Sequence, residues 1–260
     1  MTPDLAVQIV SYRTRAYLSE CLPSVIAALV DSGLTYDVAV LENGSGDDLS
    51  HLEERVGSSV RFLSSPTNRG FGGGHNDLAT TSSSTYLCVL NPDVVLTDPT
   101  IFRRLIRHFA DDRVAIVGPA LRETNGDIQR WDHGELRGLR ARVANAAGHA
   151  HWRPRTRPVD AAWVSGAFLV IRRSAFDDVG GFDERFFLYK EEEDLCLQVR
   201  RNGGRVIYDP SCEATHVGSV VAARQDHLVA SDAAFAAKNY PSRARRRAFG
   251  LMYRVTRRFG

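Results

Sequence analysis

The sequence predicts an α/β fold in which helices flank both faces of a mostly parallel β-sheet. Through the first 97 residues, apolar segments of strand length alternate with helix-length or polar segments, which is the pattern of parallel strands joined by crossovers. The 260-residue chain is 43% hydrophobic, enough for a large buried core. No apolar run approaches the roughly 18 residues that a membrane-spanning helix needs.

The first 97 residues contain four expected strands and one clearly patterned helix. The strands are expected at 5–12, 36–43, 59–65 and 84–92. The helix is expected over about residues 16–30, where apolar side chains recur at helical spacing. Polar, turn-forming residues follow the first, second and fourth strands, and parallel sheets bind ligands beyond the carboxyl ends of their strands. This edge of the sheet is therefore the expected binding edge.

After residue 97 the pattern changes. A helix is expected at 98–109, strands at 114–121 and 167–171, and a short helix where Ser174 and Asp177 have capping-box spacing. The stretch 132–160 is rich in Arg, His, Gly and Pro and is expected to be a mobile loop.

The cysteines and the N-terminus indicate the cellular compartment, and the charge is unevenly distributed along the chain. The four cysteines form no CxxC pair and lie in apolar contexts, so buried thiols in a reducing compartment are expected, without a zinc site or disulfide framework. The N-terminus lacks the features of a signal peptide, which favours a cytoplasmic protein. The net charge of +2 conceals a C-terminal segment, 241–260, that holds seven arginines and no acid.

An acidic run, 191–194, follows the aromatic-rich segment 186–189 with only Lys190 between them. Acids in the first turn of a helix complement its dipole, and Gly203 with Gly204 would supply the C-cap. That role explains one or two acids. A carboxylate site for a metal, a base or a substrate hydroxyl remains open for the others.

Three further features have both a chemical and a structural reading. The glycine-rich segment 67–77 offers backbone donors for a phosphate or sugar, or is a flexible turn, and it matches neither the dinucleotide nor the P-loop pattern. Asn91 and Asp93 end an apolar strand, where a carboxylate can reach a divalent ion, or they form an ordinary turn. His216 follows another apolar segment and is a candidate metal ligand or a structural histidine.

Taken in order, these segments resemble the inverting glycosyltransferases of family 2, whose catalytic domain has the nucleotide-diphospho-sugar fold called GT-A. The resemblance covers about residues 5–220 and is most specific over 163–219. This last segment is similar to bacterial rhamnosyltransferases that extend polyprenyl-diphosphate-linked GlcNAc in cell-wall or surface-polysaccharide assembly. The resemblance implies a GT-A domain at 1–220, with a nucleotide-binding half at about 1–97 and an acceptor and catalytic half at about 98–220. Residues 221–260 would form a helical, arginine-rich extension.

The resemblance also implies roles for individual residues. The residues expected to bind the nucleotide-sugar are Ser11, Tyr12, Glu42, Asn43, Gly70, Gly73, Asn76, Asn91 and Asp93. Those expected to bind the acceptor are Trp163, Ser165, Gly166 and Glu191. Asp93 and His216 would hold Mg²⁺ or Mn²⁺, which neutralises the leaving diphosphate. Glu192 would be the general base, with Glu191 orienting the acceptor and Asp194 supporting the helix start.

The chain departs from the family pattern at Arg13, Glu42 and Glu192, where asparagine, aspartate and aspartate are common. The expected activity is transfer of L-rhamnose from dTDP-rhamnose to a lipid-linked acceptor. A UDP-hexose donor with another acceptor, and an inactive nucleotide-sugar-binding relative, remain alternatives. A nucleotidyltransferase is disfavoured because no glycine follows the first strand.

The segment 241–260 interleaves arginines with apolar residues, which suits an anionic membrane surface. Nothing upstream resembles a nucleic-acid-reading module, so no nucleic-acid partner is expected. The expected location is the cytoplasm, peripherally bound to the inner face of the cell membrane.

Overall fold

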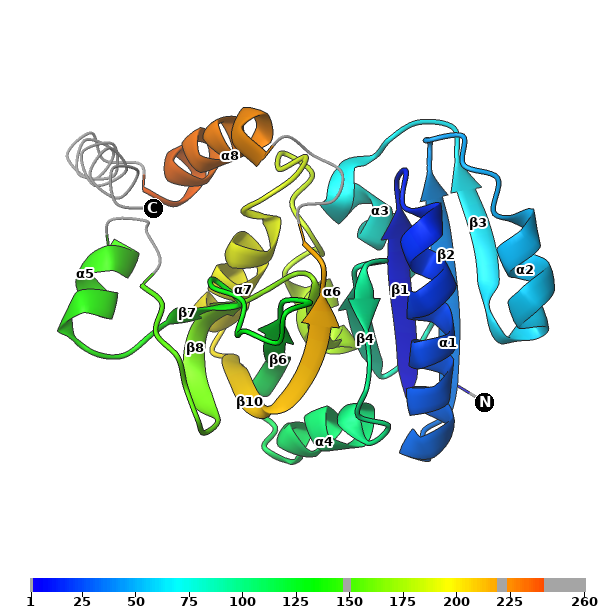
Figure 1. Cartoon of the computed structure of the whole chain (residues 1–260). Coiled ribbons are helices and arrows are strands. Elements are labelled where there is room, and N and C mark those ends of the chain that lie inside the picture. The colour runs from blue at the N-terminus through cyan, green and yellow to red at the C-terminus, as the bar shows by residue number, and fades with distance from the viewer. Residues whose placement is uncertain (1, 147–150, 219–223, 241–260) are drawn as a thin grey trace.

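The computed structural model describes residues 2–146, 151–218 and 224–240, and within them the chain forms one ten-stranded sheet (Figure 1). The strands are β1 (Leu5–Ser11), β2 (Tyr36–Asn43), β3 (Arg61–Ser65), β4 (Tyr86–Leu90), β5 (Val94–Val95), β6 (Val114–Arg122), β7 (His133–Glu135), β8 (Val159–Val164), β9 (Phe168–Arg172) and β10 (Arg205–His216). Their order is β3-β2-β1-β4-β9-β6-β10-β8-β7, and β5 pairs with β10.

Most strands of this sheet run in one direction. The neighbours β3, β2, β1 and β4 are parallel, and β6 is parallel to β10. Between these two groups lies β9, which is antiparallel to both β4 and β6. The expected α/β fold with a mostly parallel sheet is therefore confirmed. The expected basic tail at 241–260 lies outside the described residues.

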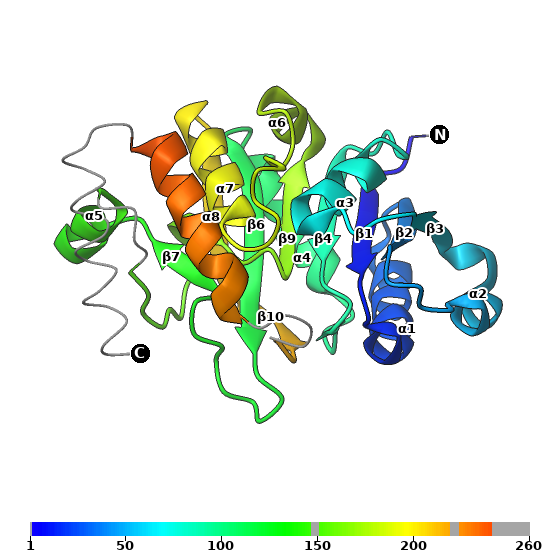
Figure 2. The same cartoon turned by 90° about the horizontal axis from the view of Figure 1, so that it is seen from above.

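Helices cover both faces of the sheet (Figure 2). They are α1 (Arg15–Ser32), α2 (Ser50–Val56), α3 (Gly70–Ala79), α4 (Ile101–Ile106), α5 (Leu139–Ala146), α6 (Arg173–Asp178), α7 (Glu191–Arg201) and α8 (Arg224–Asn239), with 3₁₀ turns at Gly57–Ser59 and Arg107–Ala110. One hydrophobic core lies between the sheet and α1, α2 and α4, and a second lies between the sheet and α6 and α7. None of the described helices combines the length and apolar character needed to cross a membrane.

The segment 132–160, expected to be a loop, contains β7 and α5. Three of its charged or titratable side chains are buried: Asp132, His133 and Glu135. Asp132 accepts hydrogen bonds from the Tyr208 hydroxyl at 2.6 Å and the Trp152 indole at 2.9 Å. Polar and Gly/Pro-rich composition suggested a loop, but long-range contacts satisfy these groups inside the protein.

Helix α7 starts and ends at the residues expected from the sequence. Gly203 has the left-handed φ of 91°, and its N–H bonds to the Arg200 carbonyl at 3.1 Å. The Gly204 N–H bonds to the Val199 carbonyl at 3.0 Å. Together these bonds form a Schellman motif, so the glycine C-cap is confirmed. The four acids lie in the first turn, at the opposite end of the helix.

Candidate active site

The carboxyl ends of β1 and β2 lie side by side, because Ser11 is in register with Glu42. The Ser11 hydroxyl hydrogen-bonds the Thr14 hydroxyl at 2.8 Å. Next to it, Arg13 has a left-handed φ of 57° and its guanidinium carbon lies 5.3 Å from the centre of the Tyr12 ring. An aromatic ring with a cation beside it thus lies at the sheet edge where a nucleotide is expected.

Glu42 and Asn43 shape the loops that follow β2. The Glu42 carboxylate accepts the Ser45 N–H at 2.6 Å and the Ser45 hydroxyl. The Asn43 carboxamide accepts the Arg69 N–H at 3.0 Å and donates to the Gly70 carbonyl at 3.1 Å. Asn43 therefore fastens the end of β2 to the start of α3.

The glycine-rich segment forms α3 and packs closely against other parts of the chain. A Cβ on Gly72 would lie 2.8 Å from the Phe182 Cβ, and one on Gly74 would lie 2.9 Å from Val10. Gly70 has a φ of 74°, and a Cβ there would lie 2.5 Å from a backbone carbonyl oxygen. Close packing alone thus accounts for these glycines.

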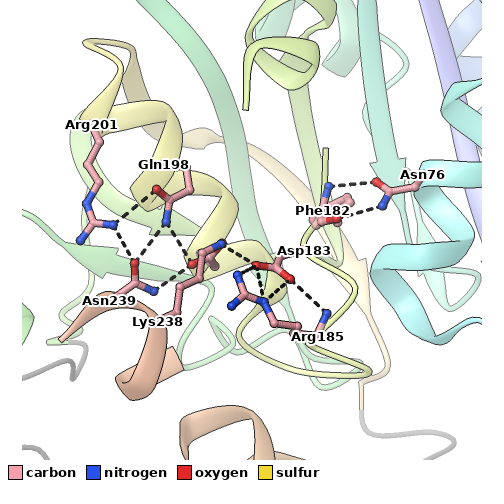
Figure 3. A network of polar contacts seen from close by, with 9 residues as sticks. Asn76, Phe182, Asp183, Arg185, Gln198, Arg201, Lys238 and Asn239 are labelled. Atoms are coloured by element: carbon pink, nitrogen blue, oxygen red, sulfur yellow. Dashed lines mark hydrogen bonds and ion pairs between the residues drawn. The ribbon is translucent and has the colours of Figure 1, made fainter. Parts of the chain in front are cut away.

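Gly73 and Asn76, expected near the diphosphate-sugar, face the segment 182–184. A Cβ on Gly73 would lie 3.7 Å from the Glu184 carboxylate. The Asn76 amide donates to the Phe182 carbonyl and its oxygen accepts the Phe182 N–H, both at 2.9 Å (Figure 3). These bonds give Asn76 a structural role in joining α3 to this segment, and its expected role toward the donor stays a prediction.

Asp93 and His216 lie together beyond the end of β4. The Asp93 Oδ1 is 3.4 Å from His216 Nε2, and the Asn91 amide nitrogen is 3.2 Å from the same Nε2. On the far side of the ring, His216 Nδ1 is 2.7 Å from the Gln129 Oε1, an acceptor that holds the proton on Nδ1. This tautomer leaves Nε2 with a lone pair beside a carboxylate.

Such a pair of acceptors fits one side of a divalent ion. Burial acts to raise the pKa of Asp93, but its contact with His216 and the hydrogen bond donated by the Gly218 N–H lower the pKa overall, which keeps the carboxylate ionised. In the described part of the chain, no three His, Cys, Asp or Glu side chains cluster to hold a metal. Further ligands would have to come from a bound diphosphate or water.

The loop between β8 and β9 contacts both Asn91, which lies beside the Asp93–His216 pair, and the first turn of α7. The Ala167 carbonyl accepts the Asn91 N–H at 2.8 Å, and the Ser165 hydroxyl accepts the Ala167 N–H at 3.2 Å. A Cβ on Gly166 would lie 3.3 Å from the Glu192 Cβ. The structure therefore brings the expected acceptor residues Ser165 and Gly166 between the strand-end Asn91 and the first turn of α7.

Trp163, on β8, lies against β7. A Cβ on Gly134 would be only 2.1 Å from its indole nitrogen, so the ring needs the glycine opposite it. The indole N–H is buried and finds no hydrogen-bond partner among the described residues.

The four acids of α7 divide into two pairs. Glu193 accepts from Lys190 at 2.7 Å, while Asp194 accepts from Lys238 at 2.6 Å and from Asn239 at 2.9 Å. Both lysines belong to a polar network between α7 and α8, part of which Figure 3 shows. Asp194 therefore anchors α8 to α7.

Glu191 and Glu192, by contrast, each have an Oε2 that is buried and without a hydrogen-bond partner in the described part of the protein. Burial, followed by the charge of Glu193, raises the pKa of Glu192 to about 7. Burial and the charge of Glu192 raise the pKa of Glu191 well above its usual range. One carboxyl group is thus poised to exchange a proton near neutral pH.

Sequence reasoning did not identify the residues that hold these acids in place. Lys190 lies 3.4 Å from Asp232 of α8, and its ammonium is 5.6 Å from the centre of the Phe235 ring. The Ser231 hydroxyl donates to the Leu188 carbonyl at 2.7 Å. No short motif marks these residues, because the partners are some 40 residues apart in the chain.

A mostly parallel sheet with acidic side chains at its carboxyl edge, next to a carboxyl group with a raised pKa, is compatible with a transferase that uses a nucleotide-linked substrate. Residues 6–180 match the family model described as "Glycosyl transferase family 2", and the chain therefore belongs to this family.

Among characterised relatives, the chain is 30% identical over 240 residues to the N-acetylglucosaminyl-diphospho-decaprenol L-rhamnosyltransferase of Mycobacterium tuberculosis, with 83% of this chain and 76% of the relative covered. It is also 43% identical to the rhamnosyltransferase WbbL of Escherichia coli K12, over 54 residues that cover 21% of this chain and 20% of the relative.

Solved structures confirm the GT-A fold. The mannosyltransferase PcManGT of Pyrobaculum calidifontis, in complex with GDP-Man and Mn²⁺, matches with a TM-score of 0.64 at 13% identity, covering 96% of this chain and 68% of that one. GalNAc-T7 with UDP, GalNAc and Mn²⁺ matches with a TM-score of 0.63 at 14% identity, covering 83% of this chain and 44% of that one.

Proposed function

We propose that this chain is an inverting rhamnosyltransferase that moves L-rhamnose from dTDP-rhamnose to a polyprenyl-diphosphate-linked GlcNAc acceptor. The observation that carries the proposal is Glu192, a carboxylate with one buried, unpartnered oxygen and a pKa of about 7, beside the β8–β9 loop to which Asn91 is hydrogen-bonded. The rhamnosyltransferase relatives support the choice of donor and acceptor.

In the proposed reaction, deprotonated Glu192 accepts the proton of the acceptor hydroxyl as that oxygen attacks the anomeric carbon. The neighbouring Glu191, whose pKa is raised by burial and by the charge of Glu192, is proposed to orient the acceptor through a hydrogen bond. Trp163, with its unpartnered indole N–H, and the loop residues Ser165 and Gly166 form the rest of the acceptor site. A single base without a second nucleophilic carboxylate is consistent with inversion.

At the donor side, Ser11, Tyr12, Glu42 and Asn43 are proposed to surround the base and ribose. Gly70, Gly73, Asn76 and Asn91 are proposed to border the diphosphate-sugar. Asp93 and His216 would hold Mg²⁺ or Mn²⁺, which when bound supplies positive charge to the leaving diphosphate. The Gln129 contact to His216 keeps the Nε2 lone pair directed toward that site.

A lipid-linked acceptor requires the enzyme to work at a membrane. We propose that residues 1–220 form the catalytic domain and that 221–260 form an extension whose arginine-rich segment, 241–260, binds anionic lipid at the cytoplasmic face.

The test is release of nucleoside diphosphate from dTDP-rhamnose, UDP-glucose, UDP-galactose, UDP-GlcNAc and GDP-mannose. Each donor is assayed with Mg²⁺ or Mn²⁺, with and without a short-chain polyprenyl-diphosphate-GlcNAc. Release that requires both dTDP-rhamnose and the acceptor supports the proposal. Acceptor-dependent release from a UDP-sugar instead would replace the donor, and binding of donors without any transfer would indicate an inactive nucleotide-sugar-binding relative.

A further inference from the structure

Buried polar atoms without partners concentrate around α7. In the described part of the chain, buried side-chain atoms without a hydrogen-bond partner occur on Gln8, Asp47, His75, His133, Trp163, Glu191, Glu192 and Arg200. Four of these residues lie on α7 or on β8, which packs against it. Because native proteins pair more than about 90% of buried polar groups, such a concentration indicates that a polar ligand supplies the missing partners.

Arg200 is the cation of this group. Its Nε is buried and unpartnered, and no described carboxylate forms an ion pair with it. Burial lowers the pKa of its guanidinium, and the groups whose charges act on it are Cys196, Tyr240 and Arg201. The adjacent Arg201 is different, because it donates to the Asn239 Oδ1 at 2.7 Å and faces α8 (Figure 3). A half-buried guanidinium without an anion is costly unless an anion arrives from outside.

The position of Arg200 relative to Glu192 defines which anion fits. The two residues are eight positions apart, two helical steps of four through the buried Cys196, and about 12 Å apart along the helix axis. Glu192 is the proposed base at the reacting hydroxyl of the acceptor sugar. A phosphate group attached at the opposite end of that sugar would lie away from the base, in the direction of Arg200.

The surroundings of Arg200 suit the start of a lipid chain. Tyr240 is one of the groups that affect the pKa of Arg200. Its hydroxyl donates a hydrogen bond to the Asn145 carbonyl of α5 at 2.8 Å. Both views place α5 beside the C-terminal end of α8 (Figures 1 and 2). On α5, Leu139 is 79% exposed and Val143 is 53% exposed, one helical turn apart. Exposed apolar side chains thus lie on α5, the helix that Tyr240 contacts.

We propose that Arg200 binds the diphosphate of the acceptor, with its Nε–H and terminal N–H groups donating to phosphate oxygens, and that it selects diphosphate-linked over neutral acceptors. This inference rests on the proposed function, because it takes Glu192 as the position of the reacting hydroxyl. A planar guanidinium suits this role since it can bind two oxygens at once.

The experiment compares the wild type with Arg200→Gln on two acceptors, a short-chain polyprenyl-diphosphate-GlcNAc and octyl-GlcNAc, which has no phosphate. Arg200→Gln is expected to raise the KM for the diphosphate acceptor about tenfold or more and to change kcat/KM for octyl-GlcNAc less than twofold. Arg201→Gln is the matched control, because its pairing with Asn239 predicts lower thermal stability and an unchanged ratio between the two acceptors. Equal losses on both acceptors for Arg200→Gln, or no loss, would overturn the proposal.

A binding measurement separates this inference from the proposed function. Farnesyl diphosphate is titrated into each protein by calorimetry with the donor site saturated by dTDP and Mg²⁺. The assignment is supported if the wild type and Arg201→Gln bind farnesyl diphosphate and Arg200→Gln binds it about tenfold more weakly. This holds even if no rhamnosyl transfer occurs. Equal binding by all three proteins, or none by the wild type, refutes it. Failure of transfer with every donor would refute the proposed function alone.

Discussion

Replacing Glu192 with glutamine is expected to abolish transfer and, above neutral pH, to make the folded protein more stable. The carboxyl group is half-buried beside Glu191 and Glu193, with one oxygen unpartnered, so its charged form is disfavoured in the folded state. Glutamine keeps the size of the side chain and removes the charge. Loss of a general base typically costs about 100- to 10,000-fold in rate.

The size and sign of the stability change follow from the pKa. The folded-state pKa of about 7 lies above the usual value of 4.5, so the folded protein holds the proton more tightly. Stability is highest below the usual pKa and is lost as the pH rises through about 7. The shift corresponds to roughly 3 kcal/mol in total, of which about 2 kcal/mol falls between pH 5 and pH 8.

The assay is urea unfolding at pH 5 and pH 8, together with nucleoside-diphosphate release. The free energy of unfolding of Glu192→Gln, measured relative to the wild type, should increase by about 2 kcal/mol from pH 5 to pH 8. Wild-type kcat should rise with pH through about 7 as the base deprotonates. Glu193→Gln is the control, because it breaks the pair with Lys190 and should lose stability at pH 8. A Glu192→Gln protein that is active within a few fold, or equally stable relative to wild type at both pH values, would refute the reasoning.

Three other changes test the remaining parts of the site. Asp93→Asn should remove the Mn²⁺ dependence of donor binding measured by calorimetry, and unchanged dependence would contradict the metal assignment. Lys238→Met leaves the buried Asp194 carboxylate without its cation and should lower the free energy of unfolding by about 3 kcal/mol, whereas a loss below about 1 kcal/mol would show that Asn239 suffices. Deleting 241–260 should abolish co-sedimentation with anionic liposomes and preserve transfer to octyl-GlcNAc, and equal sedimentation of both forms would exclude the membrane role.

Local patterns were sufficient to predict the elements that depend on local rules. The strands at 36–43 and 61–65, the first helix and the glycine end of α7 all follow from periodicity and capping chemistry. The same patterns place polar residues at the carboxyl ends of β1, β2 and β4. The expected site is therefore largely a consequence of sheet topology, which alternating segments encode.

Other features depend on contacts between distant segments and left no local signal. The glycines of α3 suit hydrogen bonding to a phosphate or sugar, or a flexible turn, but no local pattern shows that Gly72 and Gly74 make room for Phe182 and Val10. The buried Asp132 lies in a stretch with the composition of a loop, and only its contacts to Tyr208 and Trp152 explain its burial. Arg200 and Arg201 are adjacent residues of the same type, so the sequence cannot tell them apart. The packing of α8 gives Arg201 a partner in Asn239, whereas the Arg200 Nε has none.

The lysines show how the acidic start of α7 is kept folded. Lys190 and Lys238 are the only two lysines in a chain that otherwise uses arginine, and each binds one acid of this turn, Glu193 and Asp194. A compact ammonium group fits a buried carboxylate from one side, whereas a guanidinium needs a wider planar space. Because each of these two acids pairs with a lysine, their repulsion of Glu191 and Glu192 is reduced, although the charge of Glu193 still raises the pKa of Glu192. The two lysines therefore permit a buried, proton-exchanging carboxyl group next to three other acids, which unpaired acids at this spacing would make unstable.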